Sequence, residues 1–120
     1  MKFEGTWVGL GTVLTRDATV NPSSVTTVDA EYLVEIGKFT KKCYIIKIIE
    51  NNTNTYFSTV YALEENIARG EFSVPNGFGN LTFIQKTDKK ARLGLSTVSN
   101  TDEGLVNTAV SIKLCRKCAC

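Results

Sequence analysis

An alternation of apolar and polar residues with a period of two runs through most of this chain, and helical periodicity is nearly absent. The clearest stretch is Thr27 to Ile36, in which every even-numbered side chain is apolar and every odd-numbered one except Leu33 is polar. Val106 to Leu114 alternates in the same manner. This pattern is typical of antiparallel strands with one buried face and one solvated face, so it predicts an all-β fold.

Short turn sequences divide the chain into eight predicted strands of this kind. Besides the two above, strands are predicted at Phe3 to Thr15, Thr40 to Glu50, Asn54 to Leu63, Asn66 to Val74, Asn80 to Thr87 and Ala91 to Ser99. The separators are rich in Asn, Gly, Pro and Asp, and the Asn76-Gly77 pair supplies the positive φ that tight hairpin turns require.

Closure of the sheet follows from the strand count and the short connections. A meander of eight strands leaves its first and last members as exposed edges unless the sheet closes on itself. We therefore predict an eight-stranded antiparallel up-and-down β-barrel. A two-sheet β-sandwich is the alternative, but it needs longer crossing connections than this sequence contains.

Length and composition indicate one folded domain. The chain has 120 residues, of which 42% are hydrophobic and 22% charged, close to the average for globular proteins. We expect the barrel to occupy residues 1–114 and a cysteine-rich tail to occupy 115–120. The most apolar stretch, Cys43 to Ile49, is interrupted by Lys47 and is far shorter than the ~20 residues of a membrane-spanning helix.

Two compositional features exclude many functions. The chain has no histidine, which removes His-based catalytic triads, His-ligated haem and His-bearing zinc sites. A net charge of +2 creates no large electrostatic field that would recruit nucleic acid. Basic residues cluster locally at Lys41-Lys42, Lys86 to Arg92 and Arg116-Lys117, and we expect these clusters to lie on turns and strand ends. The first residues lack the apolar region of a signal peptide, so the sequence leaves the compartment open.

The first predicted strand contains Gly5-Thr6-Trp7 followed by Gly9 and Gly11, and the three glycines share one face with Trp7. Alternate glycines on one face allow a strand to bend and another group to approach closely. Gly5-Thr6-Trp7 resembles the Gly-x-Trp signature of calycins, the superfamily of lipocalins, fatty-acid-binding proteins and avidins. The longer pattern from Gly5 to Gly11 is similar to the start of nitrobindin-like barrels.

The resemblance implies a small barrel that holds a ligand inside, with Trp7 either at that ligand or as a plug in the core. The departures from the family are specific. Without histidine the haem of nitrobindin-like proteins is not carried over, so no cofactor is implied. There is no helical lid after the first strand, no helix after Leu114, and only one tryptophan where avidins have several.

Candidate ligand-binding residues are the aromatic and polar side chains that a barrel would direct inward. They are Trp7, Tyr32, Tyr61, Arg69, Glu71, Phe83 and Gln85. Arg69, Glu71 and Gln85 would need hydrogen bonds or a polar ligand if they are buried. The alternative is that their part of the chain is inverted, with Phe72 and Val74 inside and Arg69 and Glu71 exposed to water.

Four cysteines, at 43, 115, 118 and 120, leave three states open. A flexible tail of free thiols is one, disulfides are the second, and a site of four sulfurs for a soft metal is the third. Three cysteines within six residues are hard to pair with one another. In an oxidising compartment a disulfide is therefore expected to join Cys43 to one of the three if the strand of Cys43 lies beside the tail. Cys115 is expected to leave the sheet at the barrel rim.

Three functional hypotheses follow. The first is a non-enzymatic protein that binds a small, largely apolar ligand in the barrel. The second is a protein-interaction module that could form a homodimer, because the strand from Thr40 to Glu50 is apolar on both faces. The third is an enzyme, an isomerase or chromophore lyase, in which Arg69 and Glu71 share a pocket and one of them moves a proton. The sequence contains no recognisable catalytic motif and predicts no metal site outside the cysteines.

Overall fold

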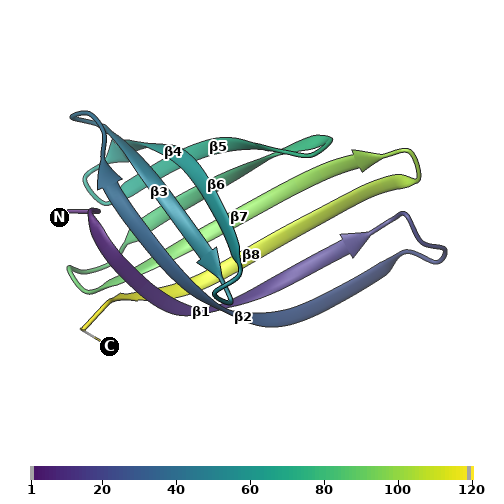
Figure 1. The fold of residues 1–120 in the computed structure, drawn as a ribbon, viewed down its shortest axis with the longest axis horizontal. Coiled ribbons are helices and arrows are strands. Elements are labelled where there is room, and N and C mark those ends of the chain that lie inside the picture. Colours follow the sequence, from purple (N-terminus) through teal and green to yellow (C-terminus); the bar gives the residue numbers. More distant parts are fainter. Residues whose placement is uncertain (1, 119) are drawn as a thin grey trace.

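A computed structural model describes residues 2–118 and 120 and shows a closed, antiparallel, up-and-down barrel (Figure 1). The all-β prediction and the barrel are confirmed, and the sandwich alternative is not. The strands are β1 (Gly5–Asp17), β2 (Ser24–Lys38), β3 (Cys43–Glu50), β4 (Asn54–Glu64), β5 (Ile67–Val74), β6 (Gly77–Gln85), β7 (Lys90–Thr101) and β8 (Gly104–Arg116). No helix among the described residues is long and apolar enough to cross a bilayer.

Closure is made by the first and last strands. β1 pairs with β8 from Trp7 opposite Arg116 to Asp17 opposite Val106, while every other strand pairs with its neighbours in the sequence. All eight strands therefore have two partners over at least part of their length, as the prediction from edge exposure required.

The strands differ in length, and this gives the barrel two unlike ends. β3 has only 8 residues beside the 15 of β2, and its pairing with β2 stops at Tyr32 opposite Glu50. The β4–β5 pairing likewise stops at Thr59 opposite Glu71. Beyond the β3–β4 turn the long β1–β2 and β7–β8 hairpins and the tip of β5–β6 continue without the β3–β4 hairpin in front of them (Figure 1). We call this half the open end and the half near the termini the packed end.

Aromatic side chains fill the packed end. The indole of Trp7 is fully buried. The ring centre of Phe83 lies 5.3 Å from the Trp7 ring centre, and the guanidinium of Arg116 lies 4.2 Å from it. Phe3 meets Phe83 and Tyr44 edge to face, and its carbonyl accepts a hydrogen bond from Trp7 Nε1 at 3.0 Å. The interior here is a close-packed core rather than a cavity.

Two glycines of β1 allow groups of neighbouring strands to approach its backbone closely, as the sequence predicted. A methyl group at Gly9 would lie 1.8 Å from the Lys113 carbonyl oxygen, and one at Gly11 would meet the ring of Tyr32 at 2.8 Å. At the Asn76-Gly77 turn the positive φ belongs to Asn76, whereas Gly77 is required because the Val98 carbonyl would lie 1.8 Å from a side chain there.

Several strand boundaries differ from the sequence prediction. Cross-strand pairing extends β2 and β6 through residues with weak alternation, so that β2 begins at Ser24 rather than Thr27 and β6 at Gly77 rather than Asn80. β3 is shorter than predicted and begins at Cys43 rather than Thr40, because Thr40 and Cys43 hydrogen-bond to each other in the β2–β3 turn. β8 continues to Arg116, so the expectation that Cys115 leaves the sheet is wrong: Cys115 lies opposite Val8 and Lys90. Val28, predicted to be buried, is 60% exposed because β2 has lost its neighbour β3 at that point.

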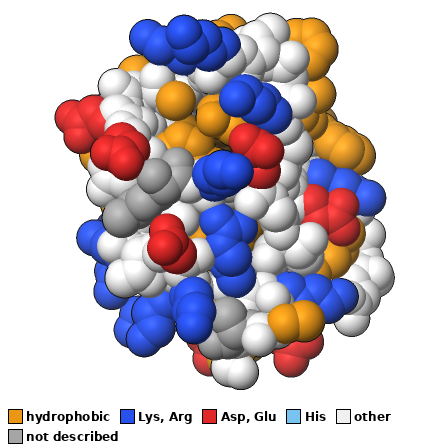
Figure 2. All heavy atoms as spheres, turned by 90° about the vertical axis from the view of Figure 1, so that its left-hand side faces the viewer, with side chains coloured by type: hydrophobic (Ala, Val, Ile, Leu, Met, Phe, Trp, Pro, Cys, Tyr) orange, Lys and Arg blue, Asp and Glu red, His pale blue; other side chains and the backbone are white. Residues whose placement is uncertain are grey.

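The three basic clusters gather at the packed end. Lys41-Lys42 lie in the β2–β3 turn. Lys86 and Lys89 lie in the β6–β7 turn, while Lys90 and Arg92 belong to the start of β7. Arg116 is the last residue of β8, and Lys117 follows it. Figure 2 views this end and shows the basic side chains spread across it with acidic ones between them. Placement on turns and strand ends agrees with the sequence interpretation.

We predict that Gly9→Ala lowers the free energy of unfolding by about 1–3 kcal/mol, the usual effect of overpacking, because β1 and β8 must separate to admit the methyl group. The matched control is Gly94→Ala, where nothing lies within 4 Å of the added carbon. We expect the control to stay within about 1 kcal/mol of the parent. Urea unfolding of the three proteins measures the difference, and equal stabilities would contradict the close contact.

Candidate functional site

A cup with a volume of about 270 Å³ lies at the open end of the barrel. Seven of the eight strands contribute side chains to it, all but β6. The lining residues are Val13, Tyr32, Glu50, Tyr56, Phe72, Val74, Leu95, Thr97, Thr108 and Val110. The volume falls near the lower end of the range for small-molecule sites, and the mostly apolar walls with few polar groups match their usual composition.

Two aromatic side chains of the cup lie beside glycines. The ring of Phe72 occupies the space over Gly79 on the neighbouring strand, where an added methyl group would meet it at 2.5 Å. The ring of Tyr32 lies over Gly11 in a similar way. Covering a glycine with an aromatic ring protects the bare backbone and fixes the orientation of the ring.

One carboxylate, two phenols and the hydroxyls of Thr97 and Thr108 supply the polar groups of the cup. Tyr32 donates a hydrogen bond of 2.7 Å from its hydroxyl to Glu50 Oε2, and Asn54 Nδ2 lies 3.4 Å from the other carboxylate oxygen. Burial raises the pKa of Tyr32, and the hydrogen bond to Glu50 and the charge of that carboxylate raise it further. Burial and the same charge also raise the pKa of Tyr56. Glu50 is the one charged residue among those lining the cup.

The predicted site residues divide into three groups, and only Tyr32 lines the cup. Trp7 and Phe83 belong to the packed end, where they contact each other, so Trp7 has the surroundings of the core plug that was the alternative at the sequence level. Neither contributes to the cup.

Gln85 is fully buried on the inward face of β6, as the sequence predicted. Neither its Oε1 nor its Nε2 has a hydrogen-bond partner within residues 2–118 and 120. Leaving a buried amide unpaired costs free energy, so this position works against the stability of the packed end.

Tyr61, Arg69 and Glu71 lie together, but on the outer surface. All three are exposed and line a shallow groove over β4, β5 and β6, and Arg69 Nε donates to the Thr82 hydroxyl at 3.3 Å. The inverted alternative is therefore correct for β5: Phe72 and Val74 face the cup, while Arg69 and Glu71 face water. The enzyme hypothesis required this pair in a buried pocket, and its placement gives that hypothesis no support.

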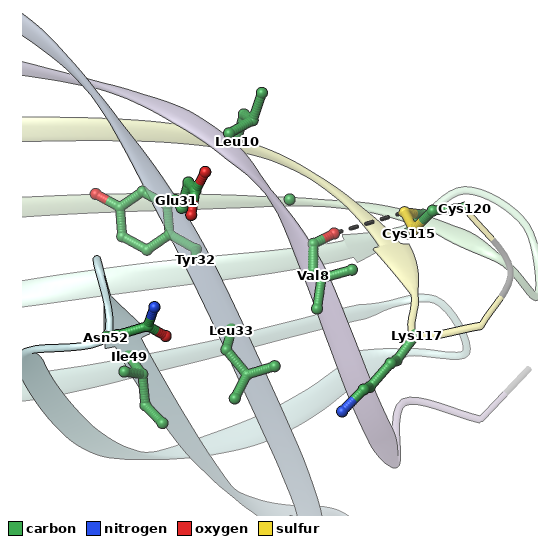
Figure 3. A pocket seen from close by; sticks show the side chains of 11 residues that line it. Val8, Leu10, Glu31, Tyr32, Leu33, Ile49, Asn52, Cys115, Lys117 and Cys120 are labelled. Atoms are coloured by element: carbon green, nitrogen blue, oxygen red, sulfur yellow. Dashed lines mark hydrogen bonds between the residues drawn. A yellow bond between two sulfur atoms is a disulfide. The ribbon is translucent and has the colours of Figure 1, made fainter.

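A second groove crosses the outer face of β1 and β2 and ends at the C-terminal cysteines (Figure 3). Val8, Leu10, Leu33 and Ile49 form its apolar part, between Asn52 of the β3–β4 turn and Lys117. It is a surface depression between side chains that point away from the barrel, whereas the cup is enclosed by inward-facing side chains from most of the strands.

Two of the tail cysteines pair with each other, which the sequence analysis did not expect. Cys115 and Cys120 form a disulfide with a Cα–Cα distance of 5.8 Å, which the positive φ of Cys118 accommodates by reversing the chain. Cys43 lies on β3, which pairs with β2 and β4 and not with β8, so it has no disulfide partner and neither does Cys118. No cluster of metal-ligating side chains occurs in the part of the chain that the structure describes.

Sequence reasoning missed most of the cup. Tyr56 was visible only as one of four tyrosines, and Glu50 gave no signal of its own. Phe72 and Val74 were named only as the inward-facing residues of the inverted alternative. The cup arises from the difference in length between β2, with 15 residues, and β3, with 8, because inward-facing residues beyond the end of a short strand line an opening. The predicted strands Thr27 to Ile36 and Thr40 to Glu50 are nearly equal in length, so the sequence prediction did not contain this difference.

A scan against protein-family models and a search of curated proteins found no match for this chain. The function must therefore be argued from the barrel and its cup.

We predict that Gln85→Met raises the free energy of unfolding by about 1–3 kcal/mol, because it removes the unpaired amide and keeps the side-chain volume. The control is Gln85→Glu, which keeps the shape but buries a carboxyl group and should lower stability. Thermal and urea unfolding test both variants. A less stable Gln85→Met protein would mean that the amide does have a partner.

We predict that Tyr32 stays protonated in the folded protein as the pH rises above about 10, the usual pKa of tyrosine. Because its folded pKa exceeds the unfolded one, its contribution to stability is complete below that pH and is lost as the pH rises further. Spectroscopic titration of tyrosinate should show a late phase that contains Tyr32 and Tyr56. Its amplitude should fall in Tyr32→Phe, where only Tyr56 still titrates late, and should stay unchanged in Tyr61→Phe. An unchanged late amplitude in Tyr32→Phe would contradict the assignment.

Proposed function

We propose that this protein is a non-enzymatic, calycin-like binding protein that holds a small, largely apolar molecule in the cup at its open end. The observation that carries the proposal is the convergence of apolar side chains from β1, β5, β7 and β8 around a polar corner made by Tyr32, Glu50 and Tyr56. The hydroxyls of Thr97 and Thr108 are the other polar groups of the cup. The Gly5-Thr6-Trp7 resemblance and the closed eight-stranded barrel support a calycin-like architecture.

The polar corner favours one class of ligand. Glu50 accepts a hydrogen bond from Tyr32 and can accept another from a hydroxyl or amino group of a ligand. A ligand carboxylate would place a second negative charge beside Glu50 in a partly dry site, which is unfavourable. We therefore propose a neutral or cationic ligand with a hydrogen-bond donor, rather than a fatty acid.

Apolar contact would supply most of the affinity. Burying apolar surface contributes roughly 25 cal/mol per Å², so a rigid ligand that fills the cup gains several kcal/mol before the cost of association is subtracted. Val13, Leu95 and Val110 line the cup and also pack against the core cluster, so they form walls that are already in place before binding.

We expect 1-aminoanthracene, a rigid apolar amine that fluoresces in dry surroundings, to bind at least roughly tenfold more tightly than anthracene-9-carboxylate, a difference of ~1.4 kcal/mol. Glu50→Gln should reduce that preference, because it removes the charge and keeps the shape. Fluorescence titration measures both affinities. Equal binding of the amine and the acid by the parent protein would contradict the role of Glu50.

Location of the probe is tested by a pair of tryptophan variants on one strand. Thr108→Trp would fill the cup and should abolish binding, whereas Ser111→Trp places the same side chain on the outer face of β8 and should not affect it. Loss of binding in the Ser111 variant, or retention in the Thr108 variant, would place the probe elsewhere.

A protein-interaction module is the second candidate, favoured by apolar side chains on the outer face of β3 and β4. Ile45, Phe57, Tyr61 and Leu63 are all exposed there, and Lys47 Nζ lies 5.9 Å from the ring centre of Phe57. A contiguous apolar surface of this kind commonly marks a contact with another protein. Phe57→Lys would interrupt this surface and leaves the cup unchanged, so it separates the two candidates.

A further inference from the structure

The first half of β2 has a free edge at the open end of the barrel. The segment Ser24–Glu31 pairs with β1 on one side, but on the other side the pairing with β3 begins only at Tyr32 (Figure 1). Exposed strand edges pair readily with other strands, and natural proteins protect them with charged side chains, above all lysine, with proline, bulges or covering segments. Between Ser24 and Ala30 there is no Lys or Pro, Asp29 is the one charged residue, and the register with β1 is continuous.

The direction of the free backbone groups follows from the end of β3. Asn51 donates its backbone N–H to the Glu31 carbonyl at 2.8 Å, and its Oδ1 accepts from the Glu31 N–H at 2.9 Å. The backbone groups of Glu31 therefore point away from β1, and those of every second residue before it do the same. Asp29, Thr27 and Val25 thus direct their N–H and C=O groups outward, where the backbone hydrogen bonds of the described residues do not reach them.

The sequence of this edge is complementary to itself. In antiparallel pairing about a two-fold axis at Thr27, Thr27 faces Thr27 of a second copy and Val25 faces Asp29. The only charged residues of the segment then lie opposite valines rather than opposite each other. A register shifted by two residues toward Asp29 would bring Val25 opposite Glu31, whose backbone groups Asn51 already occupies.

From this edge we infer that a second copy of this chain pairs with β2, forming a two-fold dimer through residues 24–30. The pairing would make about six backbone hydrogen bonds. It would also cover Val25 and Val28, which are 63% and 60% exposed in the single chain. Because the contact is isologous, it uses the same edge of both copies and closes on itself without further growth.

Sedimentation of the full chain over a roughly thousandfold range of micromolar concentrations tests the dimer, with a monomer–dimer equilibrium expected. Thr27→Pro removes the N–H that is shared across the axis but no hydrogen bond to β1, and proline is tolerated on edge strands. It should weaken the dimer at least roughly tenfold. Phe57→Lys alters the apolar outer face of β3–β4 and should leave the dimer unchanged.

A cysteine pair tests the register and does not depend on proline being tolerated. In a Cys43→Ser, Cys118→Ser background, Thr27→Cys should form a covalent dimer on mild oxidation, because its two copies meet at the axis. Val25→Cys should not, because its two copies would lie more than ~13 Å apart along the strands.

Three results would overturn the inference: a monomer at every concentration, a dimer lost in Phe57→Lys but kept in Thr27→Pro, or equal cross-linking of the two cysteine variants. If the protein is strictly monomeric, the free edge of β2 would instead be a site for an extended segment of a different protein. Probe binding in the cup is measured separately, so failure of the dimer and failure of the proposed function can be distinguished.

Discussion

The guanidinium of Arg116 joins the parts of the chain that must meet for the barrel to close. It lies over the ring of Trp7 and donates to the carbonyl groups of Lys2, Glu4 and Asp88. Three segments distant in sequence are thereby held around one buried indole at the packed end. Pairing strands from opposite ends of a chain carries a large entropic cost, and a charged group with several partners offsets part of it.

The two ends of the barrel are built differently. Phe3, Trp7 and Phe83 fill the packed end, whereas at the open end β3 stops at Glu50 while β2 continues. The same early stop produces both the cup and the free edge of β2. Glu50 and Asn51 mark the boundary, since Glu50 carries the charge of the cup and Asn51 hydrogen-bonds the backbone of Glu31, the residue next to the last pair between β2 and β3.

The architecture could be predicted from the sequence because the alternation of β2 and β8 is strong and the turns are short. The orientation of β5 could not be predicted with the same certainty, since both faces of Ile67 to Phe72 contain small or polar residues and periodicity alone does not choose between them. Packing decides it: Ala68 and Gly70 fit inside the barrel where Arg69 and Glu71 would not. Tyr32 was found because it lies within a clear strand. Phe72 followed only from the inverted alternative for its strand, and Glu50 acquires its role only from where β3 ends. The Cys115–Cys120 disulfide was missed because the extension of β8 to Arg116 and the reversed backbone at Cys118 leave no mark in the spacing of the cysteines.

The antiparallel pairing of β1 with β8 also determines how the barrel would respond to mechanical load. Lys2 and Lys117 lie at the same end of the molecule, where Lys117 donates its backbone N–H to the Thr6 carbonyl at 2.9 Å (Figure 1). A force that pulls these two ends apart acts along the hydrogen bonds of the β1–β8 ladder, which run perpendicular to the strands. The hydrogen bonds of this ladder would break one after another rather than together. The contacts of Arg116 would be loaded first, so resistance to stretching would be concentrated in that one side chain.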